Sequence, residues 1–231
     1  MSEPGSKRRS GRVHNAEGAR EAILNAAEAV FAEHGFDGAR IDAIAKTAGY
    51  NKSLIFQYFG DKLGLYAAVI RRADDQTRSW QDEVLRELSA TGTESVDQMK
   101  KLLRTYICKY FDYLVEHPHI MRIYNWEMAE GWQTFSKIIT QRDYDDVNEF
   151  SPVLARLQKA GMLRSKPEPI MQVFYAIYSS ATYLAFPPLY KTLMPDVDFS
   201  SPGELTHARE FIADFVVNGL LILPKEKSRK K

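Results

Sequence analysis

Residues 41–62 limit what this chain can fold into more than any other segment. The first part of this segment repeats apolar side chains at the spacing of one helical face, namely Ile41, Ile44, Ala45 and Ala48. Gly49 follows directly, and a glycine can take the positive φ that ends a helix. Asn51 can then cap a second helix. Two short helices joined at a glycine predict a helix-turn-helix.

The second of these helices divides into an inward side and an outward side. Ile55 and Phe59 lie four residues apart, so we expect both to pack inward. Lysine and tyrosine can bind phosphate oxygens, while serine and glutamine can hydrogen-bond base edges in the major groove. The first amides of such a helix also attract phosphate. We therefore predict a DNA-binding surface made of Lys52, Ser53, Leu54, Phe56, Gln57 and Tyr58.

A wider set of residues, between about 20 and 70, keeps a defined order and spacing. Its members are Ala27 to Phe31, Gly35-Phe36, Ile44-Ala45, Ala48-Gly49, Lys52, Tyr58-Phe59 and Lys62. Together they resemble the DNA-binding domain of the TetR family of transcriptional regulators. That family usually has Ser or Thr before its second helix, where this chain has Ala39-Arg40, so we expect Arg40 to replace the phosphate contact. Lys62, which opens a fourth helix, completes the expected DNA contacts, and Phe56 lacks the hydroxyl that is common at its position.

Each of these residues also has a purely structural interpretation. Aromatic side chains at helical spacing lie in a core more often than against a ligand, which applies to Phe56 and Tyr58. Lys52 and Lys62 could be solvated charges. Their joint arrangement after Gly49 favours DNA contact.

Composition restricts the class of protein further. The chain has 231 residues, of which 45% are hydrophobic, enough for one large or two modest cores. Its apolar runs are shorter than the ~18 residues of a membrane-spanning helix, and its N-terminus lacks a hydrophobic signal region, which together predict a cytoplasmic protein without a membrane partner. A net charge of +1 argues against general adhesion to nucleic acid, so any DNA contact must be local.

Helical periodicity along the whole chain predicts an all-α fold. We expect an N-terminal three-helix helix-turn-helix domain followed by a larger helical ligand-binding and dimerisation domain. The first helix should run from about Glu17 to Glu33, and the domain boundary should fall near residue 70 inside a fourth helix capped by Asp61. The expected organisation is a disordered basic arm over 1–16, a helix-turn-helix domain over 17–70, a helical domain over 71–224 and a basic tail over 225–231.

Two features of this organisation have alternatives. The arm carries Lys7, Arg8, Arg9 and Arg12, which could follow DNA phosphates or simply keep the protein soluble. Pro152 either kinks a helix over 144–160 or starts a new one. The other helices of the second domain are expected after a Ser95 cap up to about 116, then over 118–130, 134–142 and 169–185, and finally after the Ser201-Pro202 cap up to about 222.

Residues 100–190 offer more aromatic and methionine side chains than a small helical bundle needs. Such side chains line apolar pockets, although a plain helical core is the alternative for each one. The family resemblance implies a pocket for a small hydrophobic or aromatic effector, and it implies a homodimer through the last two long helices, over about 169–190 and 202–222. We expect the effector to contact Tyr106, Tyr110, Tyr124, Glu127, Met128, Phe174 and Tyr178.

Patterns for catalysis or metal binding are weak. Cys108 lies in a helix without a nucleophile motif, so we interpret it as a core residue, with a redox sensor as the alternative. His117-Pro118-His119 could offer metal ligands, but ordinary capping at a helix junction fits better. Asp143, Asp145 and Asp146 lack the glycine and spacing of a calcium loop. We expect no catalytic residue, no metal and no cofactor.

These patterns together predict a transcriptional regulator that is not an enzyme. We expect a homodimeric repressor that binds a palindromic operator in double-stranded DNA and is released by a small hydrophobic molecule. Two alternatives remain at this point. One is a DNA-binding protein of the same fold without a small-molecule switch, and the other is a helical enzyme or carrier.

Overall fold

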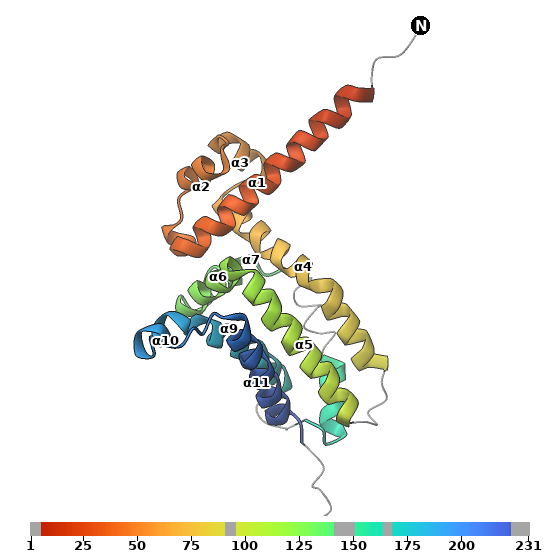
Figure 1. Cartoon of the computed structure of the whole chain (residues 1–231). Coiled ribbons are helices and arrows are strands. Elements are labelled where there is room, and N and C mark those ends of the chain that lie inside the picture. The colour runs from red at the N-terminus through yellow and green to blue at the C-terminus, as the bar shows by residue number, and fades with distance from the viewer. Residues whose placement is uncertain (1–5, 91–95, 141–150, 164–167, 223–231) are drawn as a thin grey trace, which may run out of the picture. The chain divides into compact units, whose positions relative to one another are not determined.

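The structure is a computed structural model that describes residues 6–90, 96–140, 151–163 and 168–222 (Figure 1). Helices joined by short turns make up these ranges, which confirms the all-α expectation. Within them the one β-type pairing is an isolated bridge between Leu163 and Leu221. Beside this bridge, the Ile222 amide donates to the Met162 carbonyl at 2.8 Å.

The chain divides into two compact units, and neither is continuous in sequence. The N-terminal unit contains residues 1–76 and 118–139, and the C-terminal unit contains residues 77–117 and 140–231. The N-terminal unit therefore includes a segment, residues 118–139, that periodicity assigned to the second domain. Its contacts, given below, explain this grouping.

The N-terminal unit is built around an aromatic cluster. Phe31 stacks on Phe36 with ring centroids 6.2 Å apart, and Tyr66 meets the edge of Phe31 at 5.0 Å. Phe31 and Tyr66 are each at most 1% exposed. The helices of this unit are α1 (Ser6–Gly38), α2 (Ile41–Ala48), α3 (Lys52–Phe59), α4 (Lys62–Ala90) as far as Gln76, α6 (Pro118–Ala129) and α7 (Phe135–Ile138).

The limits of α1 differ from the expectation at its N-terminal end. Residues 6–16, for which we predicted a disordered arm, have a helical backbone continuous with the rest of α1. Lysine and arginine are good helix formers, so a basic sequence can extend a helix that is already anchored downstream. At the other end Gly35 has φ 67° and interrupts the helical backbone, as its position in the sequence predicted. The side chains of the basic arm lie outside what the structure describes.

The C-terminal unit has its own apolar core between α5, α9 and α11. Phe111 is 1% exposed and faces Tyr183, with ring centroids 6.3 Å apart, and Ala213 is fully buried. The Ser201 hydroxyl accepts a hydrogen bond from the Glu204 amide at 3.4 Å, which confirms the predicted cap. The helices of this unit are the remainder of α4, α5 (Val96–Glu116), a helical segment over 151–159, α9 (Pro169–Ala185), α10 (Pro187–Leu193) and α11 (Pro202–Leu220).

Several sequence expectations fall wholly or partly on other residues. The Ser95 cap, the Asp143, Asp145 and Asp146 cluster and the tail over 225–231 lie outside the described residues, as does the start of the helix expected over 144–160. The helix expected over 134–142 is shorter than predicted, because α7 ends at Ile138. A turn with positive φ at Gly131 and Trp132 separates α7 from α6.

Candidate nucleic-acid interface

The turn between α2 and α3 has the geometry that its sequence predicted. Gly49 adopts φ 74° and ψ 21°, and its amide donates to the carbonyl of Lys46 at 3.3 Å. Asn51 then caps α3, because its side-chain oxygen accepts a hydrogen bond from the Leu54 amide at 2.9 Å. These two local devices set the direction of α3 relative to α2.

One side of α3 fixes the helix to the unit. Ile55 is fully buried, which confirms its predicted core position. Phe59 is half-buried and not fully buried as expected, and the exposed Arg20 guanidinium lies 5.4 Å from the centre of its ring. After α3, the Gly64 backbone lies so close to Phe59 that a Cβ there would stand 2.1 Å from the Phe59 carbonyl oxygen. The junction of α3 and α4 therefore requires glycine at this position.

The other side of α3 is open to solvent. Lys52, Ser53 and Gln57 are exposed, and Phe56 keeps 46% of its surface exposed, a high value for a phenyl group. Leu54 and Tyr58 are half-buried at the margin of this face. Arg40, just before α2, is also exposed. We call Arg40, Lys52, Ser53, Phe56 and Gln57 the reading face.

One cation of the reading face, Lys52, already forms an ion pair. The Lys52 ammonium lies 2.5 Å from the Asp42 carboxylate, which joins α3 to α2 at the surface. A phosphate that approaches Lys52 must compete with Asp42 for the same ammonium. Such an exposed pair is worth about 0.2–1 kcal/mol, little enough for a phosphate to displace it.

Lys62 is held more firmly than the sequence suggested. Its ammonium donates to the Asp37 carbonyl at 3.2 Å and lies 4.7 Å from the centre of the Phe36 ring. Burial lowers the pKa of Lys62, and the nearby charge of Asp37 partly offsets this effect. Lys62 thus fixes the segment after Gly35, and its contact with phosphate stays a prediction.

The residues expected to bind an effector fall into both units. Tyr106 and Tyr110 lie on α5, and Phe174 and Tyr178 lie on α9, all in the C-terminal unit. Tyr106 meets the Trp80 ring edge-on at 5.2 Å, and Phe174 lies 6.5 Å from Tyr178. Burial raises the pKa of Tyr106, and it raises the pKa of Tyr178 to about 12. The remaining three, Tyr124, Glu127 and Met128, lie on α6 in the N-terminal unit.

Glu127 has a structural role that its sequence position did not reveal. Its side chain is 1% exposed, and the Tyr66 hydroxyl donates to its Oε1 at 2.6 Å. The Phe135 amide donates to its Oε2 at 3.0 Å. One buried carboxylate therefore joins α4, α6 and α7. A second contact, from the Trp126 indole nitrogen to the Ala32 carbonyl at 3.2 Å, fixes α6 to α1.

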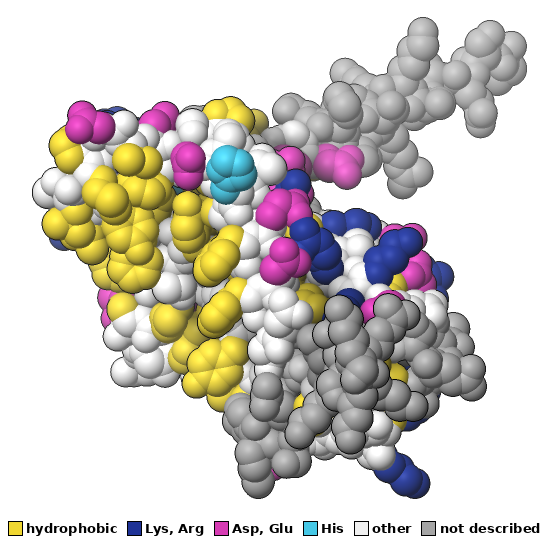
Figure 2. All heavy atoms as spheres, turned by 60° about the horizontal axis from the view of Figure 1, so that its bottom comes forward, with side chains coloured by type: hydrophobic (Ala, Val, Ile, Leu, Met, Phe, Trp, Pro, Cys, Tyr) yellow, Lys and Arg dark blue, Asp and Glu magenta, His cyan; other side chains and the backbone are white. Residues whose placement is uncertain are grey.

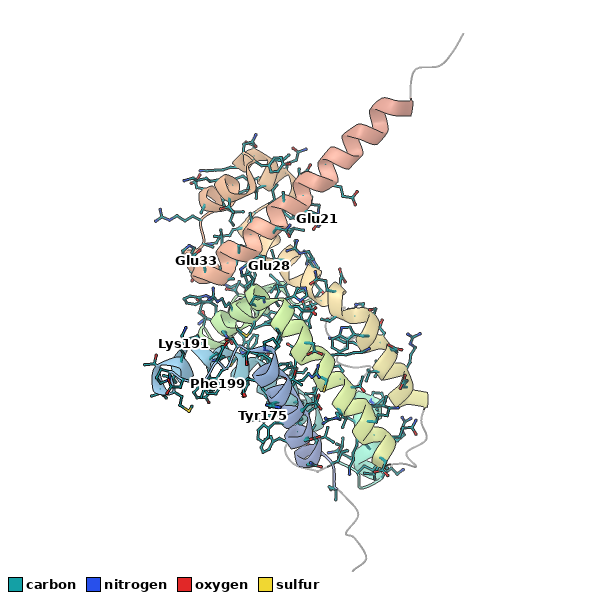
Figure 3. All side chains as sticks on the ribbon, in the orientation of Figure 1. Glu21, Glu28, Glu33, Tyr175, Lys191 and Phe199 are labelled. Atoms are coloured by element: carbon teal, nitrogen blue, oxygen red, sulfur yellow. The ribbon has the colours of Figure 1, made fainter. Side chains whose placement is uncertain are left out.

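Arg72 forms a second group of contacts that sequence analysis missed. Its guanidinium donates to Glu21 at 3.2 Å, to Asn25 at 2.7 Å and to Glu28 at 2.5 Å, and so ties α4 to α1. Glu21 and Glu28 both extend from α1 (Figure 3). The three partners of Arg72 follow helical spacing along α1, a pattern that could have indicated a binding strip for one cation.

A broad apolar area covers part of the C-terminal unit (Figure 2). On α9, Tyr175 keeps 65% of its surface exposed, and on α11 Phe211 and Phe215 keep 67% and 68%. Aromatic side chains with this exposure on two neighbouring helices are typical of a protein interface.

The candidates for redox or metal chemistry have ordinary surroundings. Cys108 is half-buried, and burial raises the pKa of its thiol, which makes it less reactive. The His117 Nδ1 lies 2.9 Å from the Tyr113 carbonyl, and the His119 Nδ1 lies 3.7 Å from Glu28. Among the described residues, no group of three potential metal ligands comes together.

Two family models match the chain. Residues 23–69 match the model for bacterial regulatory proteins of the tetR family, and residues 98–216 match the model for the tetracyclin repressor-like C-terminal domain. The chain belongs to the TetR family. This assignment confirms the family predicted from residues 20–70.

Two curated regulators with a helix-turn-helix are similar to this chain over part of their length. The transcriptional repressor SCO4008 of Streptomyces coelicolor is 34% identical over 108 residues, which cover 47% of this chain and 48% of that protein. The transcriptional activator FasR of Mycolicibacterium smegmatis is 35% identical over 113 residues, covering 49% of this chain and 47% of that protein. The chain thus spans about half the length of these two relatives.

The fold also resembles that of a solved bacterial regulator. The structure of the fatty acid degradation regulator FadR from Bacillus halodurans matches with a TM-score of 0.58 and 16% identity, over 87% of this chain and 95% of that one. At this identity the likeness concerns the fold alone. None of the described helices is both long and apolar enough to cross a membrane.

Proposed function

We propose that this protein is a homodimeric, effector-responsive repressor that binds a palindromic operator. The observation that carries the proposal is the reading face, which exposes hydrogen-bonding, cationic and apolar groups on a helix that Gly49 and Asn51 hold in place. Bacterial operators lie in the cytoplasm, so the protein acts there.

We assign separate tasks to the side chains of this interface. Ser53 and Gln57 contact base edges, because their side chains can donate and accept hydrogen bonds in the major groove. Phe56 offers an apolar contact with the bases, and Leu54 supports it. Phosphate contacts come from Arg40, Lys52, Tyr58 and Lys62, which place the helix without reading sequence.

Two copies of the reading face are needed for useful specificity. One short helix makes few base contacts, whereas two copies about one helical turn of DNA apart double the discriminating energy. The exposed aromatic side chains of α9 and α11 supply an apolar surface for such a dimer. A twofold dimer then implies a palindromic operator.

The C-terminal unit binds the effector. Tyr106, Tyr110, Phe174 and Tyr178 supply apolar area and hydroxyl groups, and residues 169–190 contain no charged side chain. The surroundings therefore suit an uncharged, largely apolar molecule. The effector must bind better to the conformation whose two reading faces are wrongly spaced, and this difference in affinity sets how far DNA is released.

Repression is the sign of regulation that we propose, as in SCO4008, although FasR is an activator. For a regulator of the same fold without an effector, no small molecule tested would change the affinity for the specific DNA sequence. A helical enzyme or carrier would show turnover or ligand transport and no preference for any DNA sequence.

Selection of binding sites from a random duplex pool tests the proposal. We expect the full-length protein to enrich one palindromic sequence, and we expect Gln57→Ala and Ser53→Ala to enrich sequences altered at defined positions. Lys46→Ala, an exposed change on α2, serves as the control and should keep the original preference. Failure of the unaltered protein to enrich any sequence would overturn the proposal.

A further inference from the structure

Arg20 lies beside the last turn of α3, although it belongs to α1. Its guanidinium is 5.4 Å from the centre of the Phe59 ring, and the Tyr58 ring lies 6.1 Å from the same ring at an angle of 77°. Arg20 and Tyr58 therefore contact one aromatic ring, and Tyr58 is a proposed phosphate contact. The Arg20 side chain keeps 49% of its surface exposed, so its donors can bind a further partner.

The carboxylate of Glu21 lies near Arg20 but is shared with Arg72. Glu21 Oε1 is 3.6 Å from the Arg20 guanidinium, whereas Glu21 Oε2 accepts a hydrogen bond from Arg72 at 3.2 Å. The pair of Arg20 and Glu21 is half-exposed on both sides, and such a pair contributes little to stability. A phosphate can therefore take the place of Glu21 beside Arg20 at small cost.

The two ends of α3 differ in the cations that they offer to DNA. An eight-residue helix is about 12 Å long, which is about the width of the major groove, so a helix lying across the groove has a row of phosphates near each end. The N-terminal end has Arg40 and Lys52, both exposed. At the C-terminal end Lys62 is engaged by the Asp37 carbonyl and the Phe36 ring, and burial lowers its pKa. This end therefore needs another cation to bind its row of phosphates as firmly.

We propose that Arg20 binds a DNA phosphate at the C-terminal end of α3 and so extends the DNA interface onto α1. This inference rests on the proposed function. A guanidinium can donate two parallel hydrogen bonds to one phosphate, which fixes direction as well as charge. Because the Phe59 ring already restricts the Arg20 side chain, less rotational freedom is lost when the phosphate binds. Phosphate contacts carry no base information, so Arg20 positions α3 without reading sequence.

A salt-titrated binding assay with the full-length protein tests this inference. The probes are the selected operator and a shuffled duplex of the same composition. We expect Arg20→Gln to weaken the binding of both duplexes about three- to tenfold and to reduce the slope of log affinity against log salt by about one. Arg20→Lys keeps the charge and should keep the slope. Arg122→Gln removes an exposed charge from α6 in the same unit and, as the control, should leave both affinities within about twofold.

Urea denaturation of each variant separates a DNA contact from a structural role. If the contact with Phe59 served stability alone, Arg20→Gln would lower the free energy of unfolding and leave the salt slope equal to that of Arg122→Gln, which would overturn the inference. If the unaltered protein binds the two duplexes equally while Arg20→Gln still reduces the slope, the proposed sequence-specific function fails and the phosphate contact stands. A reduced slope on both duplexes, in a variant that remains folded, supports the contact.

Discussion

Removal of the Tyr66 hydroxyl should destabilise the N-terminal unit, because its hydrogen bond to Glu127 offsets the free energy needed to bury that carboxylate. The hydroxyl donates to the Glu127 carboxylate at 2.6 Å, and both side chains are 1% exposed. Tyr66→Phe preserves the ring packing on Phe31 and leaves the Phe135 amide as the one hydrogen-bond partner of the carboxylate among the described residues. A buried hydrogen bond to a charged group contributes about 1.5–3 kcal/mol, so we expect the free energy of unfolding to fall by about 2 kcal/mol.

Urea denaturation followed by circular dichroism measures this loss. Tyr50→Phe, in the same unit, is the matched control, because its half-buried hydroxyl has no hydrogen bond among those described. We expect the control to change the free energy of unfolding by less than about 0.5 kcal/mol. The double variant Tyr66→Phe/Glu127→Ala should lose less than the sum of its single variants, since the two groups share one interaction. Equal stability of Tyr66→Phe and Tyr50→Phe would refute the role given to Glu127.

Three further predictions concern α3, α4 and α9. Gly64→Ala should lower the free energy of unfolding by more than about 3 kcal/mol, because the new Cβ would stand 2.1 Å from the carbonyl oxygen at the end of α3; Gly18→Ala, with open space around its Cβ, should be neutral or stabilising in the same urea experiment. Asp42→Ala removes the carboxylate that competes with phosphate for the Lys52 ammonium, so a salt-titrated DNA-binding assay should show tighter binding at low salt. Unchanged affinity at low salt would contradict a phosphate contact by this lysine. Burial raises the pKa of Tyr178 from 10.0 to about 12, so the folded state favours the protonated phenol. The free energy of unfolding should therefore fall as the pH rises between these two values, because the phenol ionises first in the unfolded chain. Tyr178→Phe should abolish this part of the fall in unfolding curves measured across the same pH range.

The local structure at the reading face could be predicted from the sequence, because each helix end and cap depends on only a few neighbouring residues. A glycine after an apolar stripe ends α2, an asparagine three residues before an amide caps α3, and a four-residue spacing buries Ile55. These rules need no knowledge of the rest of the chain. The same local reasoning placed the Asp61 cap, whose carboxylate accepts from the Gly64 amide at 2.7 Å.

Long-range contacts could not be predicted in this way. Tyr66 and Glu127 are far apart in the sequence, and neither an apolar stripe nor a capping pattern links them, so Glu127 was interpreted as an effector contact. Periodicity also gives each helix an inward face without naming its partner, which is why residues 118–139 were assigned to the second domain. The sequence did not predict the exposed side of α10 either, because the short apolar helix that begins at Pro187 has the composition of a buried helix.

The ratio of affinities for a selected operator and for a shuffled duplex of the same composition tests the central claim most directly. We predict that the full-length protein binds the selected duplex at least about 10³-fold more tightly at physiological salt. Gln57→Ala should reduce this ratio while leaving the affinity for the shuffled duplex unchanged, since the role proposed for Gln57 is a contact with bases and not with phosphates. Equal affinity of the unaltered protein for the two duplexes would contradict sequence-specific recognition by α3.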